Sequence, residues 1–120
     1  MAIVMLIVLA GVDQVRHYLA NGQKSSTLSL AAAINPYDSV VQTRLARVLI
    51  EGQRFDEAYA HYKQMFRHVE PDAASLTNFG MVCVKLNRPI EALTSFEQAL
   101  KVNPKYVPAQ RGKDLLKTSP

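Results

Sequence analysis

One stretch, residues 72–104, constrains the fold of this chain more than any other. Each half repeats apolar side chains at three- and four-residue steps, which predicts two amphipathic helices. These side chains are Leu76, Phe79, Gly80 and Cys83 in the first half, and Ala92, Leu93, Phe96, Ala99 and Leu100 in the second. Asn87 tolerates the left-handed conformation that ends a helix, and Pro89 suits the first turn of the next one. Asp72 is placed to cap the first helix, and Pro104 lies just beyond the second. The stretch is therefore predicted to be a helical hairpin.

The same pattern recurs at a step of 34 residues. Ala58 precedes Ala92 by this step, and Tyr62 precedes Phe96 by it. Three further pairs share the step: Leu45 and Phe79, Ala46 and Gly80, and Met65 and Ala99. The period and the order Phe-Gly-x2-Cys, Ala-x3-Phe, Pro resemble the tetratricopeptide repeat. The resemblance implies an all-α fold, in which helical hairpins stack into a superhelical array.

We expect a single domain over residues 1–120, made of about three repeats and a C-terminal capping helix. A degenerate first repeat is predicted at 5–38, where Lys24 stands at a position that favours alanine. The second repeat is predicted at 39–72 and the third at 73–106. A helix over 107–118 is polar enough to close the array, since a terminal hairpin would otherwise expose its apolar face.

The composition excludes several classes of protein. With 48% hydrophobic and 20% charged residues, the chain is expected to be globular rather than disordered. Its one cysteine, Cys83, excludes an intramolecular disulfide framework and a cysteine-based zinc site. The net charge of +4 favours acidic partners weakly. Basic clusters interleaved with aromatic residues are missing from the sequence, so nucleic acid is not an expected partner.

Residues 1–12 are continuously apolar, and three interpretations of them remain open. They form a first helix covered by the rest of the fold or by a second copy of the chain. Alternatively they are the end of a transmembrane helix, because twelve residues are too few for a complete span. A signal peptide is the third interpretation, although no Lys or Arg precedes the apolar run.

A catalytic or metal-binding arrangement is not evident. His61 and His68 are seven residues apart on one predicted helix, without a carboxylate between them at ligand spacing, and His17 is isolated from both. Asp56 and Glu57 are adjacent, so their side chains diverge on a helix and suit its N-terminal dipole rather than acid–base catalysis. We therefore expect a protein that is not an enzyme and has no metal or cofactor.

The resemblance also implies a binding surface. In tetratricopeptide arrays the first helix of each hairpin lines a concave groove, where peptides or partner helices bind. Carried over to this sequence, the groove residues are Arg44, Arg47, Thr77, Asn78, Met81, Lys85 and Arg111. Their cations suit a carboxylate, which arginine can bind in a bidentate manner. An acidic or amphipathic peptide is the expected ligand.

Three functions are compatible with these features. The first is a protein–protein interaction scaffold that binds a peptide or partner helix in the groove. The second is a C-terminal accessory domain of a larger membrane-bound glycosyltransferase, with residues 2–12 as the end of its transmembrane helix, because the apolar helix followed by a polar break resembles that junction. The third is a homodimer formed through residues 2–12, since such an apolar segment needs covering.

Overall fold

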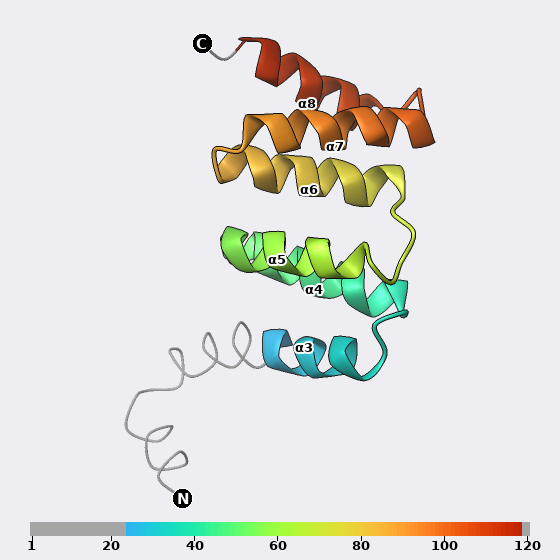
Figure 1. Cartoon of the computed structure of the whole chain (residues 1–120). Coiled ribbons are helices and arrows are strands. Elements are labelled where there is room, and N and C mark those ends of the chain that lie inside the picture. The colour runs from blue at the N-terminus through green and yellow to red at the C-terminus, as the bar shows by residue number, and fades with distance from the viewer. Residues whose placement is uncertain (1–23, 119–120) are drawn as a thin grey trace, which may run out of the picture.

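The computed structural model describes residues 24–118, and all regular secondary structure in this range is helical. The helices are α3 (Lys24–Ile34), α4 (Ser39–Glu51), α5 (Phe55–Met65), α6 (Ala73–Lys85), α7 (Pro89–Val102) and α8 (Val107–Thr118). They stack in chain order from α3 at one end to α8 at the other (Figure 1). The predicted all-α array of helical hairpins is therefore confirmed. Within the described range, none of the helices has the length and apolar character needed to cross a membrane. The predictions for residues 2–12 and His17 lie outside the described residues.

The caps of the helices repeat at the 34-residue step. Asp38 precedes α4, and its carboxylate accepts hydrogen bonds from the backbone N–H groups of Val40 and Val41, at 3.1 and 3.2 Å. Asp72 precedes α6 and accepts one from the N–H of Ser75 at 2.7 Å, as the sequence predicted. Each aspartate satisfies backbone donors that an α-helix leaves unpaired at its start. The two hairpins thus begin in the same way.

The turns inside the two hairpins also correspond. Asn87 adopts the predicted left-handed conformation, with φ of 57°, and Pro89 lies in the first turn of α7. In the preceding hairpin α4 ends at Glu51, and Gly52 is its C-cap. Gly52 has an ordinary φ of −81°, and the left-handed residue is Gln53, with φ of 59°. Gln53 precedes Asn87 by 34 residues, so the turn geometry follows the repeat rather than the glycine.

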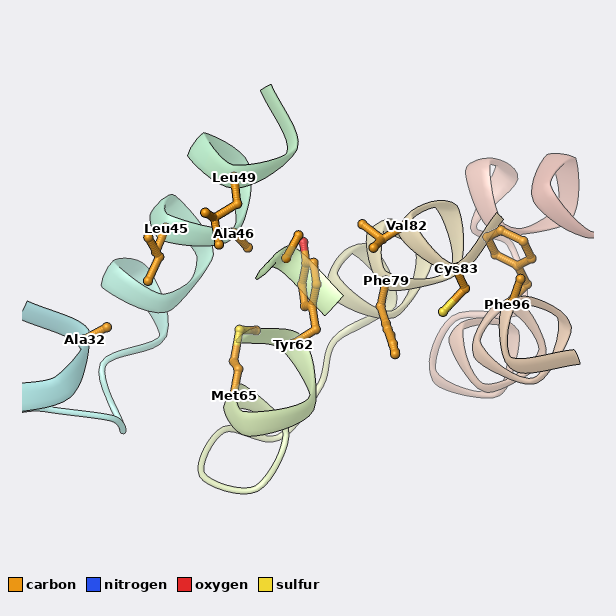
Figure 2. Close-up of a cluster of buried hydrophobic side chains, with 12 residues drawn as sticks. Ala32, Leu45, Ala46, Leu49, Tyr62, Met65, Phe79, Val82, Cys83 and Phe96 are labelled. Carbon is orange, nitrogen blue, oxygen red and sulfur yellow. The ribbon is translucent and has the colours of Figure 1, made fainter. Parts of the chain in front are cut away.

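One continuous core runs through the stack, from α3 to α7 (Figure 2). Its buried side chains include Leu45, Ala46 and Leu49 of α4, Ala58, Tyr62 and Met65 of α5, Phe79, Val82 and Cys83 of α6, and Ala92 and Phe96 of α7. A smaller cluster formed by Ala73, Leu76, Ala99 and Ala109 connects α6 and α7 to α8. Between the hairpins, the ring of Phe79 packs against Tyr62 and Phe66 with centroids 5.8 and 5.7 Å apart.

Three apolar residues of the helices, Ala31, Leu93 and Leu115, are only partly buried or exposed. In α3, Ala32 is buried, whereas the adjacent Ala31 is half-buried. Leu93 is 37% exposed, because Ala92, Phe96 and Ala99 already form the buried face of α7 and Leu93 lies beside it. Leu115 of α8 is 54% exposed, since Ala109, Gly112 and Leu116 make the contact of this helix with the array.

Candidate functional site

An exposed row of side chains follows α4 and recurs on α6. We call this surface the α4–α6 face, and it consists of Val40, Arg44, Arg47 and Glu51 with Ala74, Asn78, Met81 and Lys85. The second four follow the first four by 34 residues each, so the same helical positions face solvent in both repeats. On each helix these residues recur at three- and four-residue steps, which places them on one side, away from the core stripe.

Most of the predicted groove residues lie on this face. Arg44, Arg47, Asn78, Met81 and Lys85 are exposed there, and Arg111 is exposed on α8. Thr77 is the exception. It is only 4% exposed, and its hydroxyl donates to the carbonyl of Ala73, at 2.7 Å. The expectation that Thr77 is accessible to a ligand is therefore wrong, because this side chain satisfies its own helix instead.

Tyr62 of α5 belongs to the core cluster that also contains side chains of α4 and α6. Its ring is buried, and burial raises the pKa of its phenol to about 12. A hydrogen bond with the Asn78 side chain opposes this shift in the pKa, the charge of Asp72 adds to it, and the charge of Arg47 opposes it. Asn78 of α6 and Arg47 of α4 thus both influence the pKa of this phenol.

Charge is divided between the two kinds of helix in the described array. The first helices of the hairpins and the capping helix, α4, α6 and α8, carry six basic and two acidic residues. The second helices, α5 and α7, carry four acidic and two basic residues. Arg44, Arg47, Lys85 and Arg111 form no salt bridge with any of the residues at 24–118. The α4–α6 face thus presents cations that are not neutralised by neighbouring carboxylates.

Two clefts lie on the side of the array opposite the α4–α6 face. One opens between α3 and α5, and the other opens between α5 and α7. The first, the α3–α5 cleft, has a volume of about 340 Å³ and includes Ser29, Ala33, Gln42, Leu45, Glu57, Ala60, His61 and Gln64 in its lining. The second, the α5–α7 cleft, has a volume of about 460 Å³ and is lined by Lys63, Phe66, Arg67, Leu76, Phe79, Ile90, Glu91, Thr94, Ser95 and Gln98. None of the predicted groove residues lines either cleft.

The two clefts are equivalent places in successive repeats. Ser29, Ala33 and Ala60 of the first correspond, at the 34-residue step, to Lys63, Arg67 and Thr94 of the second. These two clefts were not predicted from the sequence. A signal was present in Glu57 and Glu91, which are identical at the same step although they are not part of the core pattern.

Two histidines, His61 and His68, line the α3–α5 cleft, and both contact other residues of the protein. Nε2 of His61 lies 2.9 Å from the carbonyl oxygen of Gln42, so this nitrogen carries the proton and donates. Burial lowers the pKa of His61. One repeat later, the hydroxyl of Ser95 donates to the carbonyl of Leu76 at 2.6 Å, in the corresponding position. His68 packs edge-on against Tyr37, with ring centroids 5.3 Å apart. Across residues 24–118, no cluster of three His, Cys, Asp or Glu side chains could hold a metal ion.

A polar cluster ties the second hairpin to the third. The hydroxyl of Tyr59 donates to Oε2 of Glu91 at 2.7 Å, and Nη1 of Arg88 donates to Oε1 at 3.1 Å. The guanidinium of Arg88 also lies over the Tyr59 ring, 4.6 Å from its centroid. The hydrogen bond from Tyr59, together with that from Arg88 and the positive charges nearby, lowers the pKa of Glu91. This cluster is an inter-repeat contact between α5 and α7.

Comparison with known proteins agrees with this architecture. The family model described as tetratricopeptide repeat matches residues 73–106, which include the α6–α7 hairpin. A Caenorhabditis briggsae protein named tetratricopeptide repeat protein 21 homolog is 27% identical over 99 residues. That alignment covers 80% of this chain and 8% of the other protein, so the chain spans a small part of this relative's length. The helical hairpins, the 34-residue step in caps and turns, and these matches make the chain similar to tetratricopeptide repeat proteins.

Proposed function

We propose that this protein is an interaction scaffold whose α4–α6 face binds an acidic or amphipathic segment of a partner protein. Tetratricopeptide repeats generally mediate protein–protein interactions, and the family likeness supports this class of function. The observation that carries the proposal is the recurrence of exposed polar and cationic residues at the same positions of α4 and α6, where Arg44, Arg47 and Lys85 form no salt bridge within residues 24–118. Cations of both repeats and the amide of Asn78 are therefore available to a ligand.

The chemistry of the face favours a carboxylate. Arg44 and Arg47 lie one turn apart on α4, and neither is paired with an acid of the described chain. A guanidinium presents a planar fork of N–H donors that fits a carboxylate, while the amide of Asn78 can both donate and accept. Met81 is 36% exposed and offers an adaptable apolar contact beside these groups. Together they suit a peptide with acidic and apolar side chains.

The test is a charge reversal with a matched control. Partners recovered by affinity capture are purified, and their affinity for the chain is measured by calorimetry. The variant Arg44→Glu plus Arg47→Glu is expected to weaken binding by about tenfold or more, equivalent to about 1.4 kcal/mol. The control, Lys101→Glu plus Lys105→Glu, changes the net charge equally at exposed sites outside the face. If both double variants bind as tightly as the wild type, the assignment of the face is wrong.

The salt dependence separates a specific site from a general charge effect. Interactions between exposed charges weaken as the Debye length shortens from about 10 Å at 0.1 M salt to about 3 Å at 1 M. Wild-type affinity is therefore expected to fall with salt, and the Arg44→Glu plus Arg47→Glu variant to show a flatter dependence. Equal slopes for the face variant and the control would indicate attraction by net charge alone and would contradict the proposed site.

The glycosyltransferase alternative depends on residues 2–12, which lie outside the described part of the chain. None of the contacts described for residues 24–118 favours it.

A further inference from the structure

The α5–α7 cleft combines an apolar floor with a cationic rim. Its floor is formed by Phe66, Leu76 and Phe79, of which Leu76 and Phe79 are almost fully buried. At its edge, Ile90 begins α7 with 82% of its surface exposed. The volume of about 460 Å³ falls within the range of about 300–1,000 Å³ that is usual for ligand sites. The cleft is therefore large enough to accept a side chain from another molecule.

Two cations, Lys63 and Arg67, lie on the rim, and only Lys63 has a carboxylate within salt-bridge distance among residues 24–118. The ammonium of Lys63 lies 3.9 Å from Oε2 of Glu91 and 5.9 Å from the centroid of the Phe79 ring. Glu91 is already engaged by Tyr59 and Arg88, as described above. Arg67 is exposed and forms no salt bridge with the rest of residues 24–118. The guanidinium of Arg67 therefore has no acidic partner within residues 24–118 and belongs to the same cleft as the apolar floor.

The equivalent cleft one repeat earlier shows that the fold does not require this combination. There, Ser29 and Ala33 take the places of Lys63 and Arg67, so the rim contributed by α3 is uncharged. The cleft occurs at the same place in both repeats because the helices stack in the same way. Its cationic rim is a property of the later repeat alone.

We propose that the α5–α7 cleft is a docking site for a protein segment that carries an apolar side chain next to a carboxylate. The apolar side chain packs on Phe66 and Phe79, and the carboxylate pairs with Arg67. This surface lies on the other side of α6 from the α4–α6 face, so it would let the scaffold hold two segments at once. The inference is independent of the proposed function, because the two sites share no residue.

The probe is a blocked peptide, acetyl-Gly-Glu-Phe-Glu-Gly-amide. It is titrated into the ¹⁵N-labelled full chain, and binding is followed by the amide chemical shifts of the protein. The titration extends to about 5 mM peptide, because weak docking corresponds to millimolar dissociation constants. Saturable shifts are expected at the amides of Phe66, Ile90 and Thr94. Replacing the two Glu residues of the peptide by Lys, or its Phe by Ala, is expected to weaken binding at least fivefold.

Two pairs of protein variants locate the site. Arg67→Glu is expected to weaken binding of the acidic peptide at least fivefold, whereas Lys101→Glu, at the same position one repeat later, leaves it unchanged. Thr94→Trp is expected to fill the cleft and abolish the shifts. Its counterpart Ala60→Trp fills the α3–α5 cleft instead and leaves them in place. Circular dichroism checks that both tryptophan variants are folded, and Arg67→Glu provides the test if Thr94→Trp is not.

Each other outcome overturns the proposal. The absence of shifts up to about 5 mM, shifts confined to the α4–α6 face, or binding unaffected by Arg67→Glu would each do so. Shifts confined to Arg47, Asn78 and Met81 would at the same time support the proposed function, so the two proposals can fail separately.

Discussion

Gly80 lies so close to the ring of Phe96 that a Cβ added at position 80 would be 2.5 Å from Cε1 of that ring. Gly112 of α8 makes a corresponding approach, and its added Cβ would be 2.5 Å from Cζ. Phe96 itself is fully buried. The ring therefore fills the space that two glycines leave on α6 and α8, and this contact attaches the capping helix to the last hairpin.

We predict that Gly80→Ala destabilises the protein. The new methyl group would overpack the core at a cost of about 1–3 kcal/mol, only partly offset by the gain of about 1 kcal/mol in helix propensity. The measurement is urea unfolding followed by circular dichroism. Gly52→Ala is the control, because its nearest contact, the carbonyl oxygen of Val48, would be 3.4 Å away. Equal stability of the Gly80→Ala variant and the wild type would show that the Phe96 ring can move aside.

Gln53 and Asn87 provide a second, matched prediction. Both have a positive φ, which costs a residue with a Cβ about 1–2 kcal/mol, and asparagine tolerates this conformation better than glutamine does. Gln53→Gly is therefore expected to raise the free energy of unfolding by up to about 1 kcal/mol, and Asn87→Gly to change it by less. Gln53→Ala keeps the strain and should bring no gain. A Gln53→Gly variant less stable than the wild type would contradict the reasoning.

The contrast between these positions shows what the sequence can predict. The hairpin over residues 72–104 could be predicted because Asp72, Asn87 and Pro89 each have a local preference that matches their place. Gln53 has no such preference, although the adjacent Gly52 correctly marks the end of α4. Only the alignment with Asn87 at the 34-residue step identifies the turn residue.

The candidate site was predictable in part for a similar reason. Exposure of Arg44, Arg47 and Asn78 follows from helical periodicity, which is a local property. Burial of Thr77 could not be derived in this way, because its position borders the core stripe and its hydroxyl can bond to its own helix. The clefts were missed because each combines side chains from three successive helices, and their depth depends on how those helices pack.

The contact between Tyr59 and Glu91 predicts a dependence of stability on acidic pH. The pKa of Glu91 is lowered in the folded protein, first by the hydrogen bond from Tyr59. Its stabilising contribution is therefore present above the unfolded-state value of 4.5 and is lost as the pH falls from there through the folded-state value. The difference in melting temperature between the wild type and Glu91→Gln should accordingly shrink below that pH.

Glu97→Gln is the control for this experiment. Glu97 is exposed and lies 3.9 Å from Lys113, without a hydrogen bond comparable to that from Tyr59. Exposed pairs of this kind contribute little. A Glu91→Gln difference that stays constant from neutral to acidic pH would show that the contact with Tyr59 does not depend on the charge of the carboxylate.

Tyr62 gives the corresponding prediction at alkaline pH. Burial raises the pKa of its phenol from 10.0 in the unfolded chain to about 12 in the folded protein. A pKa that is higher in the folded protein means that the neutral phenol stabilises the fold fully below pH 10, and that this contribution is lost as the pH rises from 10 to about 12.

The free-energy difference between the wild type and Tyr62→Phe, measured by urea unfolding, should therefore decline over this range by up to about 3 kcal/mol, at 1.36 kcal/mol per pKa unit. Tyr37→Phe, which removes an exposed tyrosine, is the control variant. If the Tyr62→Phe difference does not change with pH, the phenol ionises equally in both states, and burial does not hold Tyr62 as a neutral group.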